Sequence, residues 1–161
     1  PLVKFTREAS KIMPYGGVIL SMGYLGEERV VDSYHYMAPT KAFLASCVKN
    51  LAVEQGVNGI RINDISPGPI KTRAASGLKD FNSLVQAAVD ASPLHMAVSI
   101  HDVGNVVAAY LCASHSSISG ETIHVDAGFH AIAFASASVK QEPELEIATV
   151  ATGEQKDRKR A

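Results

Sequence analysis

Short apolar runs alternate with longer helical patterns along most of this chain of 161 residues. Three segments are predicted to be strands. Residues 18–22 form a short apolar run typical of a buried strand, residues 60–66 alternate as a strand does, and residues 121–125 form a last short strand. Three segments instead have helical patterns: residues 34–55, 80–91 and 101–113. Strand, helix, strand, helix, helix, strand is the order expected of a parallel sheet with crossover helices. The sequence therefore predicts an α/β fold.

The helical segment 34–55 has one apolar stripe, which we expect to face the sheet. Its members are Phe43, Leu44, Cys47, Val48, Leu51 and Ala52. Pro39 stands near the start of this segment. If the helix begins at Tyr34, proline removes a backbone hydrogen bond close to Lys41.

Residues 136–161 lack this periodicity and carry scattered charges with few aromatic residues, which is typical of disorder. We therefore expect one folded domain over residues 1–135, followed by a disordered tail. The net charge of −1 gives no electrostatic reason to expect nucleic acid or an anionic membrane as a partner. The sequence shows no apolar run of roughly 20 residues and no metal-binding spacing of histidines. A cytoplasmic protein is the expectation, with an organelle not excluded.

Tyr34 and Lys41 are the residues whose spacing suggests chemistry. Seven residues advance a helix by about 700°, only about 20° short of two full turns, so both side chains can share one face with Met37. Tyr24 follows the preceding strand, where a doubly wound fold opens its ligand crevice. A phenol can stabilise an oxyanion and an ammonium can hold a nucleotide ribose. Many amphipathic helices contain such a pair by chance, so ordinary packing stays open at this point.

A longer pattern surrounds this pair. It comprises Ser-Met-Gly-Tyr-Leu-Gly-Glu-Glu-Arg from Ser21, Tyr-His-Tyr-Met-Ala-Pro-Thr-Lys from Tyr34, and Ser-Pro-Gly-Pro-Ile-Lys-Thr-Arg-Ala-Ala-Ser-Gly from Ser66. It continues with His-Asp-Val-Gly-Asn from His101 and Ile-Ser-Gly-Glu-Thr-Ile-His-Val-Asp-Ala-Gly-Phe from Ile118. In order and spacing, this pattern resembles the enoyl-acyl carrier protein reductases of the short-chain dehydrogenase/reductase superfamily.

The wider superfamily places its catalytic tyrosine four residues before the lysine and a serine thirteen residues before that tyrosine. Met37 and Tyr24 occupy those positions here. The reactive tyrosine then stands one helical turn earlier, at Tyr34, as in the enoyl reductases. A ketone-reducing relative is disfavoured, because the Met37 thioether cannot donate a proton.

The resemblance implies that NADH, with NADPH not excluded, delivers hydride to a trans-2-enoyl thioester on acyl carrier protein. It assigns Tyr34, Lys41 and Tyr24 to catalysis. It assigns Lys41 and five residues after the second strand to the cofactor: Ile70, Lys71, Thr72, Arg73 and Ala74. Substrate would contact Tyr24, Tyr34, Met37, Leu78, Phe81 and Leu84. An ordinary turn is the alternative for residues 70–74, and ordinary helix packing is the alternative for Leu78, Phe81 and Leu84. The family also suggests a homotetramer.

A dinucleotide fold needs a glycine-rich turn after its first strand, and Gly16-Gly17 instead precedes a strand. We therefore expect the C-terminal part of a Rossmann-type doubly wound parallel sheet whose first half is missing. The alternative to an active reductase is a catalytically inactive remnant that folds or associates with an intact reductase subunit.

Overall fold

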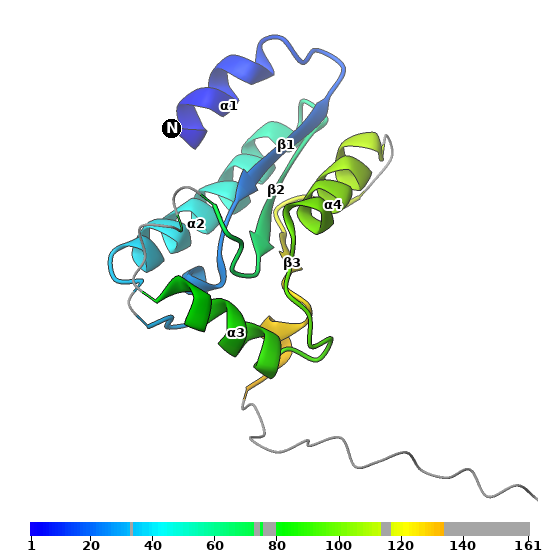
Figure 1. The fold of residues 1–161 in the computed structure, drawn as a ribbon. Coiled ribbons are helices and arrows are strands. Elements are labelled where there is room, and N and C mark those ends of the chain that lie inside the picture. The colour runs from blue at the N-terminus through cyan, green and yellow to red at the C-terminus, as the bar shows by residue number, and fades with distance from the viewer. Residues whose placement is uncertain (33, 73–74, 76–79, 114–116, 134–161) are drawn as a thin grey trace, which may run out of the picture.

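The computed structural model describes residues 1–32, 34–72, 75, 80–113 and 117–133. Three parallel strands form one sheet in the order β1-β2-β3 (Figure 1). The elements are α1 (Leu2–Ser10), β1 (Gly17–Met22), the 3-10 helix η1 (Leu25–Glu27), α2 (Met37–Gly56), β2 (Ile60–Pro67), α3 (Phe81–Ala91), α4 (Ile100–Cys112), β3 (Thr122–Val125) and the 3-10 helix η3 (Phe129–Ala131). The predicted alternation and the parallel α/β fold are confirmed.

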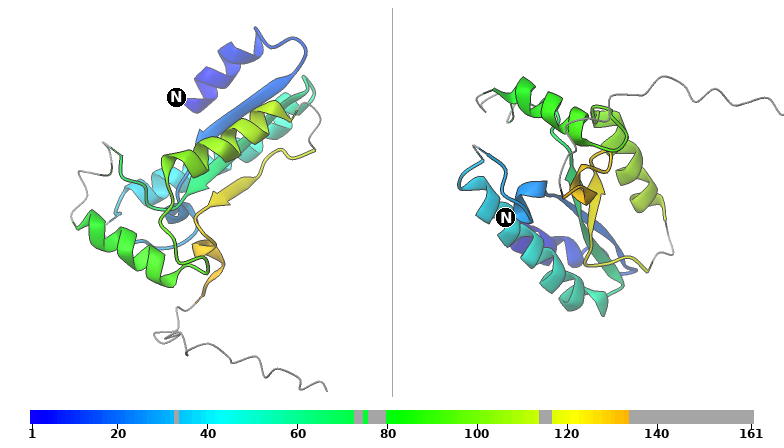
Figure 2. Two further views of the ribbon diagram at one scale, coloured as in Figure 1. Left: turned by 45° about the vertical axis from the view of Figure 1, so that its right-hand side comes forward. Right: turned by 90° about the horizontal axis from the view of Figure 1, so that it is seen from below.

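The helices cover the two faces of the sheet unequally. Helices α1 and α2 lie on one face, α4 lies on the other, and α3 lies beyond the carboxyl ends of the strands (Figure 2). The core fills the space between the sheet and α2. Its buried members are Ile19, Val48, Leu51, Ala52, Ile60 and Ile62. Strand β2 is the middle strand and is buried over almost its whole length, polar residues included.

Helix α2 begins three residues later than the sequence predicts. His35 has a φ of 43°, which lies in the left-handed region and cannot continue a right-handed helix. Because α2 starts at Met37, Pro39 is its third residue and lies in the first turn, where backbone N–H groups have no partner within the helix. The expected loss of a hydrogen bond near Lys41 is therefore wrong.

The apolar stripe of α2 is partly correct. Val48, Leu51 and Ala52 are buried, but Phe43 is 71% exposed. Phe43 lies five positions before Val48, which places it about 140° around the helix and away from the sheet.

Within the part of the chain that the structure describes, no helix has both the length and the apolar content needed to cross a bilayer. The predicted tail 136–161 lies outside the described residues, so the division of the chain at residue 135 stays a prediction.

Candidate functional site

Two tyrosines meet where the chain leaves β1. Tyr24 has an extended backbone and caps the N-terminus of η1. Tyr34 lies in the segment between η1 and α2, and its ring packs against that of Tyr24 with centroids 4.8 Å apart and planes inclined at 57°. The Tyr34 ring also lies over Gly26, the central residue of η1. The structure therefore brings together two phenols that are ten residues apart in the chain.

Lys41 reaches the same end of the sheet from α2. Its Nζ donates a hydrogen bond to the backbone carbonyl of Met22, the last residue of β1, at 2.5 Å. Tyr34 precedes α2, so the helical argument that placed Tyr34 and Lys41 on one helix face is wrong. The β1–η1–α2 connection, and not a shared helix face, places both residues near the carboxyl end of β1.

Burial keeps the two phenols in their neutral form. Removal of the ring from water and, to a smaller extent, the neighbouring Tyr34 raise the pKa of Tyr24 to about 12. Burial also raises the pKa of Tyr34, and the nearby Glu27 carboxyl raises it further. A phenol whose pKa is raised remains protonated at neutral pH and can donate a hydrogen bond.

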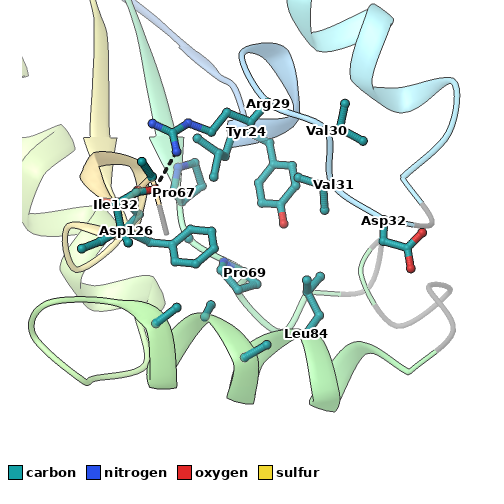
Figure 3. Close-up of a pocket in the computed structure, with 17 residues that line it drawn as sticks. Tyr24, Arg29, Val30, Val31, Asp32, Pro67, Pro69, Leu84, Asp126 and Ile132 are labelled. Atoms are coloured by element: carbon teal, nitrogen blue, oxygen red, sulfur yellow. Dashed lines mark hydrogen bonds between the residues drawn. The ribbon is translucent and has the colours of Figure 1, made fainter. Parts of the chain in front are cut away.

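An apolar cavity of about 530 Å³ opens beside Tyr24 (Figure 3). Tyr24 stands on one side of it and Leu84 of α3 on the other, and small residues of α3 form its floor. Its lining comprises Tyr24, Leu25, Arg29, Val30, Val31, Asp32, Pro67, Gly68, Pro69, Leu84, Ala87, Ala88, Ala91, Asp126, Phe129, Ile132 and Ala133. A cavity of this size and polarity suits an apolar ligand.

A long-range hydrogen bond joins the wall of the cavity that follows β1 to the wall that follows β3. Arg29 Nη1 donates a hydrogen bond of 2.7 Å to the backbone carbonyl of Ile132 (Figure 3). Asp126 also lines the cavity, and its carboxylate accepts hydrogen bonds from the backbone N–H groups of Gly128 and His130. The turn after β3 is thereby held against the cavity.

The residues predicted to contact substrate separate into three groups. Tyr24 and Leu84 line the cavity. Tyr34, Met37 and Phe81 are not among the described residues that line it, although Tyr34 touches Tyr24. Leu78 lies outside the described residues.

The segment predicted to bind the cofactor follows β2 through Pro67-Gly68-Pro69. Ile70, Lys71 and Thr72 have no regular secondary structure, and the Thr72 hydroxyl accepts a hydrogen bond of 3.1 Å from the Ala75 N–H. Arg73 and Ala74 lie outside the described residues. Among the residues that are described, no group of His, Cys, Asp and Glu could hold a metal ion.

Sequence reasoning did not find the cavity walls contributed by Arg29, Pro69, Phe129 and Ile132, nor the acidic residues Glu27 and Asp64 beside Gly23. Asp64 carried a usable signal, because in an alternating strand it falls on the same side as Ile60 and Ile62.

Comparison with known proteins shows that the sequence of this chain is similar to those of reductases. A family model described as "Enoyl-(Acyl carrier protein) reductase" matches residues 2–130. The enoyl-[acyl-carrier-protein] reductase [NADH] FabI of Bacillus cereus is 43% identical over 129 residues, which cover 80% of this chain and 50% of that protein. The [NADPH] enzyme FabI of Staphylococcus aureus is 44% identical over 125 residues, covering 78% of this chain and 49% of that protein.

A solved structure agrees with these sequence matches. The Bacillus cereus enoyl-acyl carrier protein reductase in complex with NADP+ and indole naphthyridinone superposes with a TM-score of 0.80 at 41% identity, covering 83% of this chain and 52% of that one. This chain spans about half the length of the curated relatives that it matches.

Proposed function

The chain belongs to the enoyl-(acyl carrier protein) reductase family, and we propose that it carries the catalytic half of an enzyme that reduces the carbon–carbon double bond of trans-2-enoyl groups on acyl carrier protein. One observation supports this most directly. Two neutral phenols pack together at an apolar cavity, with an ammonium group at the end of the adjoining strand.

The two phenols and the apolar cavity have different roles in the proposed reaction. Tyr34 donates a hydrogen bond to the thioester oxygen as negative charge develops there, which is the preorganised stabilisation that such a transition state needs. Tyr24 lines the cavity and positions the substrate, and its own hydroxyl assists in proton delivery. The apolar walls take up the acyl chain, because burying each methylene contributes about 0.8 kcal/mol.

The residues at the carboxyl edge of the sheet fit a nicotinamide cofactor. The bound cofactor supplies the hydride, and NADH and NADPH are both candidates because the relatives are named for either one. Lys41 holds the ribose hydroxyls from its place beside the end of β1. The segment of Ile70, Lys71, Thr72, Arg73 and Ala74 contacts the nicotinamide and pyrophosphate, since ligands of doubly wound sheets bind outside the carboxyl ends of the strands.

Acyl carrier protein is the proposed partner, and a homotetramer is the proposed assembly. The alternative function is that of a catalytically inactive remnant that folds or associates with an intact reductase subunit.

Replacement of Tyr34 by Phe tests the proposed chemistry. We expect Tyr34→Phe to lower turnover of a crotonyl thioester by about 10²–10³-fold, the usual effect of losing one oxyanion donor, measured from NADH absorbance. Tyr36→Phe is the matched control, because Tyr36 is 90% exposed and only two residues away. Equal rates for Tyr34→Phe and Tyr36→Phe would remove Tyr34 from the mechanism.

Thermal unfolding with NADH separates the two candidate functions. A chain that binds NADH gains thermal stability by mass action. No protection at millimolar NADH, together with no turnover, would favour the inactive remnant.

A further inference from the structure

A row of polar side chains crosses the sheet near the end of β1. Ser21 of β1, Asp64 of β2 and Thr122 of β3 are direct neighbours in the parallel register. Asp64 is 0% exposed, and the Ser21 hydroxyl donates a hydrogen bond to its Oδ1. A carboxyl group thus occupies the middle of a buried strand, where an unpaired charge is very costly.

A second carboxyl group reaches this row from η1. The Thr122 hydroxyl donates a hydrogen bond of 3.1 Å to Glu27 Oε1. The other oxygen of each carboxyl, Asp64 Oδ2 and Glu27 Oε2, is buried and has no hydrogen-bond partner among the described residues. Both of these oxygens lie at Gly23, because a Cβ added there would collide with each of them. The two unpartnered oxygens therefore both lie beside Gly23.

Two ionised carboxylates cannot remain together in such a place without a cation or a proton between them. The charged and titratable groups that face the pair are Lys41 of α2, His124 of β3, and Glu28 and Tyr34 beside η1. Lys41 can compensate one negative charge while its Nζ donates to the Met22 carbonyl, and the described part of the chain offers no set of metal ligands. A proton on the pair would compensate the second charge.

We propose that Asp64 and Glu27 share one proton at neutral pH, with the O–H of one carboxyl donating to the other, and that they act as positioning residues for Tyr24 and Tyr34. Glu27 ends η1, and its N–H donates a hydrogen bond of 2.9 Å to the Tyr24 carbonyl. The shared proton fastens η1 to β2, and η1 supports both tyrosine rings. Only the effect on turnover rests on the proposed function.

The electrostatics of the two groups agree with this geometry. Burial raises the pKa of Asp64, against the opposing effects of Ser21, Lys41 and His124. Burial and then the Asp64 charge raise the pKa of Glu27. A carboxyl whose pKa is raised by folding contributes stability that is fully present below its unfolded pKa of about 4 and is lost as pH rises through the folded value. His124 acts in the opposite direction, because burial lowers its pKa and its contribution is lost as pH falls.

Infrared spectroscopy of the full chain tests the shared proton without any substrate. At pH 7 the surface carboxylates are ionised, so the carbonyl stretch of a carboxylic acid reports a protonated buried group. We expect one such group in the unmodified chain and none in Asp64→Asn or Glu27→Gln, because a side-chain amide replaces the donor and leaves the other carboxylate ionised. Glu121→Gln is the control, since Glu121 is exposed and adjoins Thr122, and it should keep the band.

Absence of the band from the unmodified chain at pH 7, or its persistence in both amide variants, would overturn the proposal. The free energy of unfolding gives a second measurement: between pH 4 and 7 it should fall with rising pH less steeply in the amide variants than in Glu121→Gln. In an active form, Asp64→Asn should also flatten the dependence of kcat on pH. Loss of turnover in every form alongside the expected band would contradict the proposed function and leave the shared proton supported.

Discussion

A substitution at Gly26 can displace the Tyr34 ring while leaving the Tyr34 hydroxyl in place as a chemical group. A Cβ at Gly26 would lie 2.7 Å from Tyr34 Cδ1 and 2.9 Å from Cε1. Carbon atoms pack at about 3.5–4.0 Å, so the ring must retreat by about 1 Å. Gly26 is not among the glycines with positive φ, so alanine meets no backbone strain and the ring contact alone decides the effect.

We expect Gly26→Ala to separate stability from turnover. Tyr34 is half-buried in a connecting segment, so its ring can yield, and the cost should fall near the low end of the usual 1–3 kcal/mol for overpacking. Displacing a reacting group by about 1 Å can lower the rate by about 10²-fold. The measurements are urea unfolding, thioester turnover and near-ultraviolet circular dichroism, which reports tyrosine packing because the chain has five tyrosines and no tryptophan.

Gly104→Ala is the matched control for Gly26→Ala. A Cβ at Gly104 meets nothing within 4 Å, and Gly104 lies inside α4. Alanine there should stabilise the protein by about 0.5–1 kcal/mol and leave turnover unchanged. If Gly26→Ala matches Gly104→Ala in both turnover and the circular dichroism of the tyrosines, Tyr34 does not pack over Gly26 and the reasoning fails.

Three further changes test the framework around the site. Asn63→Ala removes the hydrogen bonds to the Ile118 carbonyl and from the Glu121 N–H, and at about 1 kcal/mol each their loss should lower the free energy of urea unfolding by about 2 kcal/mol. Ser99→Ala removes the capping box of α4 and should cost about 1 kcal/mol, seen as a lower urea midpoint. Tyr24, with its pKa raised to about 12, should ionise last in an ultraviolet titration, and Tyr24→Phe should abolish that late step; a late step that survives would assign it to another tyrosine.

The parts of the site that could be predicted are those that are local in sequence. Tyr24 and Tyr34 belong to one strand-to-helix connection and Lys41 to the start of the helix that follows it, so a correct strand end was enough to bring them to the same edge of the sheet. The reason given for Tyr34 and Lys41 was nevertheless wrong, because the left-handed backbone of His35 delays the helix. Periodicity cannot detect a single residue with positive φ.

The carboxyl pair shows a different limit of sequence reasoning. Asp64 stands in an alternating strand on the same side as Ile60 and Ile62, which signals a carboxyl group that faces the core. Its partner Glu27 lies in a short polar segment that looks exposed. The parallel register sets Ser21, Asp64 and Thr122 side by side, and the contacts of Glu27 with Thr122 and at Gly23 then show that both carboxyl groups face the same place.

The cavity forms between segments that are far apart in the sequence, and Arg29 joins two of them. The near wall follows β1, whereas the far wall comes from η3 and Ile132, more than a hundred residues later. Among the described residues, a hydrogen bond from Arg29 to the Ile132 carbonyl joins them, and it is exposed to solvent. Exposed polar contacts of this kind contribute little to stability. The closure of the cavity therefore depends on segments far apart in the chain, whereas the contact between the Tyr24 and Tyr34 rings depends on the one segment that follows β1.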